Sequence, residues 1–147
     1  MKNNYVSLER VLEMASEAAG KQYRKIPGKK IMFESCLDNG EQIVLCTPTS
    51  KYHETIDAYW IDLTKVQCDL MDTYENGIFI FRLEGEKLCL FNCCDLKPFL
   101  TEKSMRYSEQ AKDHWKLRIY NHYIKVLGNP DNFNVDCFFY KEKNSDQ

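Results

Sequence analysis

The chain has 147 residues and a formal net charge of −2, and 44% of its residues are hydrophobic and 13% aromatic. This composition excludes a disordered chain, and the charge excludes a protein that is basic throughout, so any binding of nucleic acid requires a local basic patch. No apolar run reaches roughly 18 residues or resembles a signal peptide, which predicts a cytoplasmic protein that does not span a membrane.

The first predicted element is a helix that ends at Ala19. Ser7 can cap its amino end, apolar residues follow at helical spacing, and Gly20 is suited to the left-handed conformation that ends a helix. Residues 21–30 come next, with five positive charges, no acid and a Pro-Gly pair. That composition indicates a loop.

A hairpin is predicted over residues 30–46, because two apolar runs flank the dipeptide Asn39-Gly40, which favours a tight turn. A loop at residues 47–57 and a strand at residues 58–63 follow. Thr64 and Gln67 form a capping-box pattern, which predicts a central helix through about Tyr74.

The rest of the chain predicts strands and turns. Near-continuous apolar character at 77–83 and 87–92 indicates strands that are buried on both faces. The further predictions are a helical turn at 95–100, a polar connector at 101–113, strands at 114–120 and 123–127, a turn at 128–132 and a last strand at 133–140. Together these elements predict a single α+β domain over residues 1–147, with a mostly antiparallel sheet, an N-terminal helix, a central helix and a solvated tail at 141–147.

The chain has seven cysteines. In a cytoplasmic protein thiols stay reduced, and most of these cysteines lie in apolar patterns, so we interpret them as small buried hydrophobic residues. The cluster Cys89, Cys93 and Cys94 has neither a CxxC pair nor a nearby histidine, which argues against a zinc site there.

The order helix, three strands, helix, strand over residues 7–83 resembles the core of the restriction-endonuclease-like, or PD-(D/E)XK, superfamily. The segment "YWIDLTKVQCDLM…GIFIFRL" is similar to the region around the third strand and following helix in such proteins, including a glutamine early in the helix. The resemblance covers about half of the chain. It implies a nuclease scaffold on which an acid of the second strand and a (D/E)-x-K pair of the third hold Mg²⁺ and activate water.

The residues that match those positions are Glu41, Asp62 and Lys65, with Gln67 in the helix. Glu41 and Asp62 are the candidate magnesium ligands, and Mg²⁺ is implied only if the chain is a nuclease. Lys65 follows Asp62 by three positions instead of two, so the motif is imperfect. The alternatives are a superfamily member without catalysis and ordinary polar surface residues.

A second candidate site is the strand at residues 114–120. Trp115, Leu117 and Ile119 alternate with polar or basic residues and are expected to face inward. The opposite face would present cations and aromatic rings, which suit phosphates and unstacked bases. The residues predicted to face outward here and on the next strand are His114, Lys116, Arg118, Tyr120, Tyr123 and Lys125. The alternative is a solvated sheet face with no ligand.

The basic loop could extend this surface if the fold brings the two together. Its candidate residues, interleaved with Tyr23, are Lys21, Arg24, Lys25, Lys29 and Lys30. Residues 54–75, in contrast, carry six acids and one lysine, which suits a basic partner or self-association into a homo-oligomer. The sequence therefore predicts a nucleic-acid-binding module, with a Mg²⁺-dependent nuclease and a protein-interaction or regulatory module as alternatives.

Overall fold

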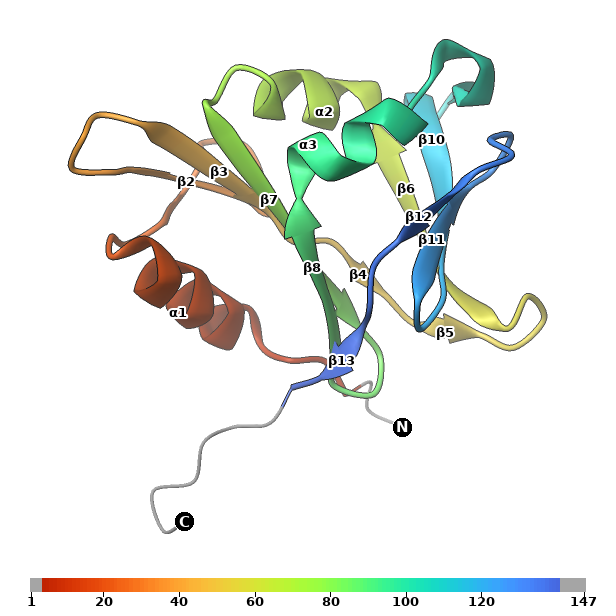
Figure 1. The fold of residues 1–147 in the computed structure, drawn as a ribbon, viewed down its shortest axis with the longest axis horizontal. Coiled ribbons are helices and arrows are strands. Elements are labelled where there is room, and N and C mark those ends of the chain that lie inside the picture. The colour runs from red at the N-terminus through yellow and green to blue at the C-terminus, as the bar shows by residue number, and fades with distance from the viewer. Residues whose placement is uncertain (1–3, 141–147) are drawn as a thin grey trace, which may run out of the picture.

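The computed structural model describes residues 4–140, and the predicted tail at residues 141–147 lies outside the described range. The described chain forms two β-sheets that pack against each other, with a long helix on the outer side of the first sheet (Figure 1). The predicted α+β class with mostly antiparallel strands is confirmed. The strands are divided between two sheets, which the sequence did not predict.

The first sheet, sheet A, has seven strands and is mixed. Its strands are β1 (Arg24–Lys25), β2 (Met32–Cys36), β3 (Gln42–Cys46), β4 (Thr49–Ser50), β7 (Asn76–Leu83), β8 (Lys87–Asn92) and β13 (Phe138–Phe139). Their order is β1-β2-β3-β7-β8-β13, with β4 beside β7. Strands β3 and β4 run parallel to β7, and the other neighbours are antiparallel.

The second sheet, sheet B, has six strands that are all antiparallel to their neighbours. Its strands are β5 (Tyr52–His53), β6 (Ala58–Thr64), β9 (Arg106–Ser108), β10 (Lys112–Ile119), β11 (Tyr123–Val126) and β12 (Asn132–Asn134). Their order is β12-β11-β10-β6-β5, and β9 pairs with the first part of β10.

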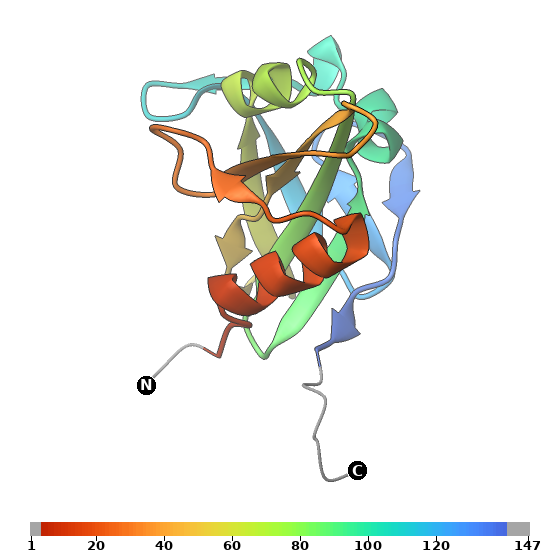
Figure 2. The same cartoon turned by 90° about the vertical axis from the view of Figure 1, so that its left-hand side faces the viewer.

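The N-terminal helix, α1 (Leu8–Ala19), was correctly predicted. The Ser7 side chain accepts a hydrogen bond from the Arg10 backbone, and Gly20 ends the helix at a φ of 71°. Val11 and Ala15 are buried in a cluster with Phe33 and other apolar residues from the outer side of sheet A. Figure 2 shows α1 lying across that side of the sheet. The apolar stripe of the helix therefore explains its position.

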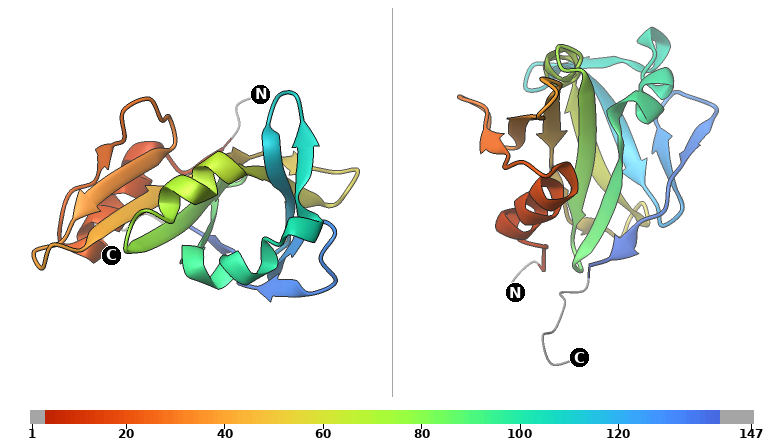
Figure 3. Two further views of the ribbon diagram at one scale, coloured as in Figure 1. Left: turned by 90° about the horizontal axis from the view of Figure 1, so that it is seen from above. Right: turned by 60° about the vertical axis from the view of Figure 1, so that its left-hand side comes forward.

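A larger core lies between the two sheets. Trp115, Leu117 and Ile119 of β10 are buried there, as predicted, and sheet A contributes Phe79 and Phe81 of β7. The two phenylalanine rings meet edge to face, with centroids 5.5 Å apart. The two sheets diverge at the end of the molecule that faces the viewer in the left panel of Figure 3, and short helices lie at that end. They are α2 (Lys65–Met71), α3 (Cys93–Leu96) and the 3-10 turns η1 (Lys97–Phe99) and η2 (Glu102–Ser104).

Several predicted boundaries differ from those observed. The capping box of Thr64 and Gln67 is confirmed, but α2 ends at Met71 and not near Tyr74. The predicted last strand at 133–140 is two short strands, because the chain leaves sheet B after β12 and joins sheet A as β13. The loops at 21–30, 47–57 and 101–113 also contain short strands, whose two or three residues are too few to produce a sequence pattern.

Candidate nucleic-acid interface

The outward side of sheet B carries the predicted cations and two residues that sequence reasoning did not place there. In the register of β10, Lys116 lies opposite Asp62, and Arg118 lies between Trp60 and Lys125. Residues directly opposite each other in an antiparallel pair project from the same face, and Tyr123 shares the face of Lys125 because it is two positions away. We call this set the basic aromatic face: Trp60, Asp62, Lys116, Arg118, Tyr123 and Lys125.

Trp60 is the centre of this face. The Lys116 ammonium lies 5.1 Å from the ring centroid and the Arg118 guanidinium carbon 5.5 Å from it, both within cation–π range. The indole Nε1 donates a hydrogen bond of 2.9 Å to Asp62, which also pairs with the Lys116 ammonium at 3.6 Å. These contacts hold the half-buried ring in a fixed orientation while part of it remains accessible to solvent.

Arg118 is not neutralised by an acidic residue on this face. Within residues 4–140, no carboxylate forms an ion pair with it, and its buried Nε has no hydrogen-bond partner. Lys125 lies on the other side of Arg118. Its ammonium donates a hydrogen bond of 3.3 Å to the Asn129 carbonyl, which carries no negative charge. Three cations therefore share a face with one carboxylate, Asp62, which leaves a net positive local charge.

Two tyrosines connect this face to a pocket at one end of sheet B. The Tyr120 and Tyr123 rings are stacked, with centroids 4.6 Å apart, and both line a pocket of about 430 Å³. Tyr52 and Tyr59 line its other side and meet edge to face at 5.4 Å. Burial raises the pKa of Tyr59, whose hydroxyl donates to the Glu84 carbonyl.

Lys87 supplies a positive charge to this tyrosine pocket. Its ammonium lies 5.6 Å from the centroid of the Tyr59 ring and also donates to the Asn121 side chain. His122, also on the pocket wall, is largely exposed and has Nδ1 2.9 Å from a carboxylate oxygen of Asp136. The pocket thus combines aromatic walls with nitrogen donors, which are the groups that a base and a phosphate contact.

His114 is a correction to the predicted surface. It was expected to face solvent, but only 1% of it is exposed. Its Nδ1 lies 2.7 Å from the Lys112 carbonyl oxygen, and its Nε2 has no partner. Strand β6 pairs with it on one side and β9 on the other, through Thr64 and Arg106. The β9 pairing was not recognised from the sequence, so the position was misjudged as open.

The basic loop does not extend this face. Strand β1 forms the far edge of sheet A, and Figures 1 and 3 place it on the opposite side of the molecule from β10 and β11. Lys21 pairs with Asp38 at 2.6 Å and Arg24 with Glu34 at 3.4 Å, while Tyr23 is buried instead of exposed among the cations. Lys25 and Lys30 are exposed and Lys29 is half-buried.

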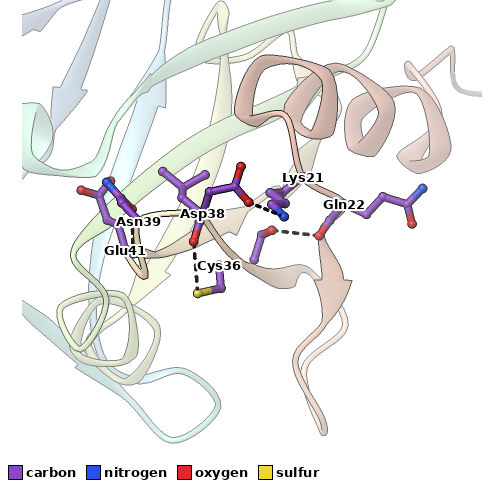
Figure 4. A network of polar contacts seen from close by, with 8 residues as sticks. Lys21, Gln22, Cys36, Asp38, Asn39 and Glu41 are labelled. Carbon is purple, nitrogen blue, oxygen red and sulfur yellow. Dashed lines mark hydrogen bonds and ion pairs between the residues drawn. The ribbon is translucent and has the colours of Figure 1, made fainter.

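The residues predicted for a nuclease site are distributed over different elements. Glu41 precedes β3 of sheet A, at the hairpin turn beside Asn39 (Figure 4), and accepts a hydrogen bond of 2.6 Å from Asn76. Asp62 lies on β6 of sheet B, bonded to Trp60 and Lys116. The third strand of the predicted core therefore belongs to a different sheet from the second.

The other two members of that set also have local partners. The Lys65 ammonium lies 2.7 Å from Asp69, and this hydrogen bond is the largest cause of the rise in the Lys65 pKa. The Gln67 side chain accepts a hydrogen bond from the backbone of Thr64 in the capping box. No group of three or more histidine, cysteine or acidic residues in the described chain could hold a metal ion. Glu41 lies beside sheet A and Asp62 in sheet B, each with its own hydrogen-bond donor, which does not fit the paired ligands of the magnesium site that the resemblance implies.

Comparisons of the chain with protein-family models, with curated proteins and with solved structures find no match. The resemblance to the restriction-endonuclease-like superfamily therefore stays a prediction. Among the described residues, no helix is long and apolar enough to cross a membrane.

Sequence reasoning predicted Tyr120 and Tyr123 but missed Trp60, Tyr52 and Tyr59, and it assigned Asp62 to a nuclease site instead of to this face. The alternation in "AYWIDL" does place Trp60 and Asp62 on one side of their strand and Ile61 and Leu63 on the other. The partner strand could not be recognised in the sequence, because the paired residues of β6 and β10, from Thr64 with His114 to Tyr59 with Ile119, are far apart in the chain and meet only when it folds. Tyr52 and Tyr59 were missed for the same reason.

Proposed function

We propose that the chain binds single-stranded nucleic acid on the basic aromatic face and in the adjoining tyrosine pocket. The observation that carries the proposal is the placement of Arg118, which lies over Trp60, has no carboxylate partner among residues 4–140 and has Lys116 and Lys125 as neighbours. A solvated face of a sheet usually mixes charges of both signs, whereas this one concentrates cations around an aromatic ring.

The cations and the aromatic rings of this site contact different parts of the nucleic acid. The guanidinium of Arg118 and the ammonium groups of Lys116 and Lys125 bind phosphate oxygens, releasing the counterions of the strand. Bases stack on the accessible rings of Trp60, Tyr120 and Tyr123, which the bases of a duplex cannot reach. The face therefore favours single strands over duplexes.

Binding without cleavage agrees best with the arrangement of the carboxylates. Glu41 and Asp62 belong to separate sheets, and each has its own hydrogen-bond donor. A metal-dependent nuclease would need them on one phosphate. If the resemblance to the nuclease superfamily reflects ancestry, this chain represents a member that has lost catalysis.

The test is fluorescence anisotropy with a labelled single strand of DNA, a single strand of RNA and a duplex, at about 50 and 200 mM salt. The expected result is salt-sensitive binding that is tighter for the single strands. Binding should weaken at least tenfold in the double variant Lys116→Gln/Arg118→Gln.

The matched control is Lys25→Gln/Lys30→Gln, which removes the same charge from exposed residues in β1, the edge strand of sheet A, and in the turn that follows it. It should bind like the wild type. Equal losses in the two double variants would show attraction to net charge without a specific site, and absence of binding at the lower salt would contradict the proposal. Products run on a gel after addition of Mg²⁺ test the nuclease alternative directly.

A further inference from the structure

Cys89 and Cys137 come together from distant parts of the chain. Strands β8 and β13 pair antiparallel, with Phe138 opposite Leu88, so extending the register by one residue sets Cys137 opposite Cys89. All seven cysteines of the chain are unpaired, and these two are the ones that a strand pairing aligns across from each other.

The register also predicts how far apart the two residues are. The Tyr140 backbone donates to the Glu86 carbonyl at 2.9 Å, which marks that pair as hydrogen-bonded. Hydrogen-bonded and non-hydrogen-bonded pairs alternate along an antiparallel ladder. Cys137 and Cys89 therefore form a non-hydrogen-bonded pair, in which the Cα atoms are roughly 4.5 Å apart. A disulfide requires a Cα separation of about 4.4 to 6.8 Å, and the separation that the register predicts falls within that range.

Both side chains also face the same side of sheet A. Cys89 belongs to the core between the two sheets, and Cys137 packs against that core, whereas Leu88 belongs to the cluster beneath α1. A hydrogen bond between the two thiols is the largest cause of the shifts in both their pKa values. It raises the pKa of Cys89 and lowers that of Cys137.

The two thiols differ in access. Cys89 is fully buried, while Cys137 is half-buried. Lys87 also lowers the pKa of Cys137, so the thiolate forms more readily on the cysteine that a reagent can reach. Cys137 therefore has the properties of an attacking thiol, and Cys89 those of a resolving thiol.

We propose that Cys89 and Cys137 form a reversible disulfide by exchange with a low-molecular-mass disulfide such as oxidised glutathione. The Cys137 thiolate attacks one sulfur of the reagent, forms a mixed disulfide and releases one molecule of reduced thiol. Cys89 then attacks the Cys137 sulfur, and its proton goes to the departing thiolate, which leaves as the second reduced thiol. Two protein thiols are oxidised and one reagent disulfide is reduced to two thiols, so atoms and electrons balance.

Formation of this bond would change the surroundings of the tyrosine pocket. The Cys137 thiol donates to the Tyr120 carbonyl at 3.3 Å, and that hydrogen bond disappears when the thiol hydrogen is lost. The Cys137 backbone still donates to the Asn121 carbonyl at 2.8 Å. The disulfide would thus fix the crossing segment between β12 and β13 to β8 while removing one support of the turn that follows β10. The proposal does not depend on nucleic-acid binding.

The experiment uses the full chain carrying Cys36→Ser and Cys94→Ser, because these two exposed cysteines would otherwise react with the reagent and between molecules. The protein is equilibrated with about 1 mM oxidised glutathione, free thiols are blocked, and proteolytic peptides are analysed by mass spectrometry. The expected product has lost two hydrogen atoms and gives a peptide that joins Cys89 to Cys137.

Closing so long a loop should also raise the Tm of the oxidised protein by about 5–10 °C, and reduction should reverse this. In the same background, Cys137→Ser should neither lose hydrogen atoms nor respond in Tm, whereas Cys68→Ser should behave like its parent. A glutathione adduct that persists on Cys137, a disulfide between other cysteines, or five unreacted thiols in the parent protein would overturn the proposal. The peptide analysis of the parent protein decides this even if a variant fails to fold.

Discussion

Arg118 lies directly opposite Trp60 on the neighbouring strand, with its guanidinium carbon 5.5 Å from the centroid of the indole ring. The arrangement combines the positive charge that attracts a phosphate with the flat ring on which a base stacks. Lys116, from the same strand as Arg118, approaches the ring at 5.1 Å, so two cations depend on one aromatic residue for their position. Trp60 should therefore matter for binding more than its own contact area suggests.

Replacement of Trp60 by alanine should weaken binding of a single strand by about 1–3 kcal/mol. One stacking surface is lost, and Lys116 and Arg118 lose the ring against which they lie. Fluorescence anisotropy at the lower salt measures this change. The control is Tyr107→Ala, since Tyr107 is 61% exposed on the separate edge strand β9. Equal losses in the two variants would mean that Trp60 has no special part in binding.

The salt dependence of binding should report the number of phosphates that the face contacts. Lys116, Arg118 and Lys125 predict a slope of about −2 for log affinity against log salt concentration, since each phosphate contact with a single strand contributes roughly −0.7. Arg118→Gln should make the slope less steep by about 0.7. Lys30→Gln, in the turn between β1 and β2 of sheet A, should leave it unchanged, and a slope near zero for the wild type would contradict phosphate contact by this face.

Local patterns predicted the parts of the fold that neighbouring residues determine. Helix α1 with its cap at Ser7, the capping box of α2 and the inward side of β10 were all correctly predicted. In each, the periodicity of the element or a hydrogen bond within four residues determines the outcome. The α+β class follows from the succession of such elements.

The features that were missed depend on contacts between distant parts of the chain. His114 is buried between β6 and β9, and Trp60 joins the basic face only because β6 pairs with β10. The assignment of β6 to a different sheet from β3 separates Asp62 from Glu41, which no local pattern could show. Strand pairing over such separations leaves no signal in a single sequence, so a candidate site assembled from several strands could be predicted only in part.

Replacement of Trp115 by alanine should lower the free energy of unfolding by about 3–5 kcal/mol, because a large side chain is removed from the core between the sheets. The loss includes the hydrogen bond of 2.8 Å that its indole donates to the Thr101 carbonyl. Urea denaturation measures the change. Trp60→Ala, which empties a half-exposed position, should cost clearly less; a similar cost for both would show that Trp115 is not an anchor of this core.

Tyr74 and Glu34 provide a prediction for alkaline pH. The Tyr74 hydroxyl donates to the Glu34 carboxylate at 2.5 Å. Burial, and then this hydrogen bond, raise the Tyr74 pKa from 10.0 to about 12. Because the folded state holds the proton more tightly than the unfolded state, the stabilisation is complete below pH 10 and is lost as the pH rises toward about 12.

The variant Tyr74→Phe isolates this effect from the other tyrosines of the chain. Its deficit in the free energy of unfolding relative to the wild type should be constant at neutral and mildly alkaline pH and should shrink above the ordinary tyrosine pKa of about 10. Denaturant titrations at a series of pH values measure the difference. Glu34→Gln should remove the part of this pH dependence that the carboxylate contributes, while the part due to burial of Tyr74 remains. A deficit that stays constant, or grows, through this alkaline range would show that the hydrogen bond does not hold the Tyr74 proton in the folded protein.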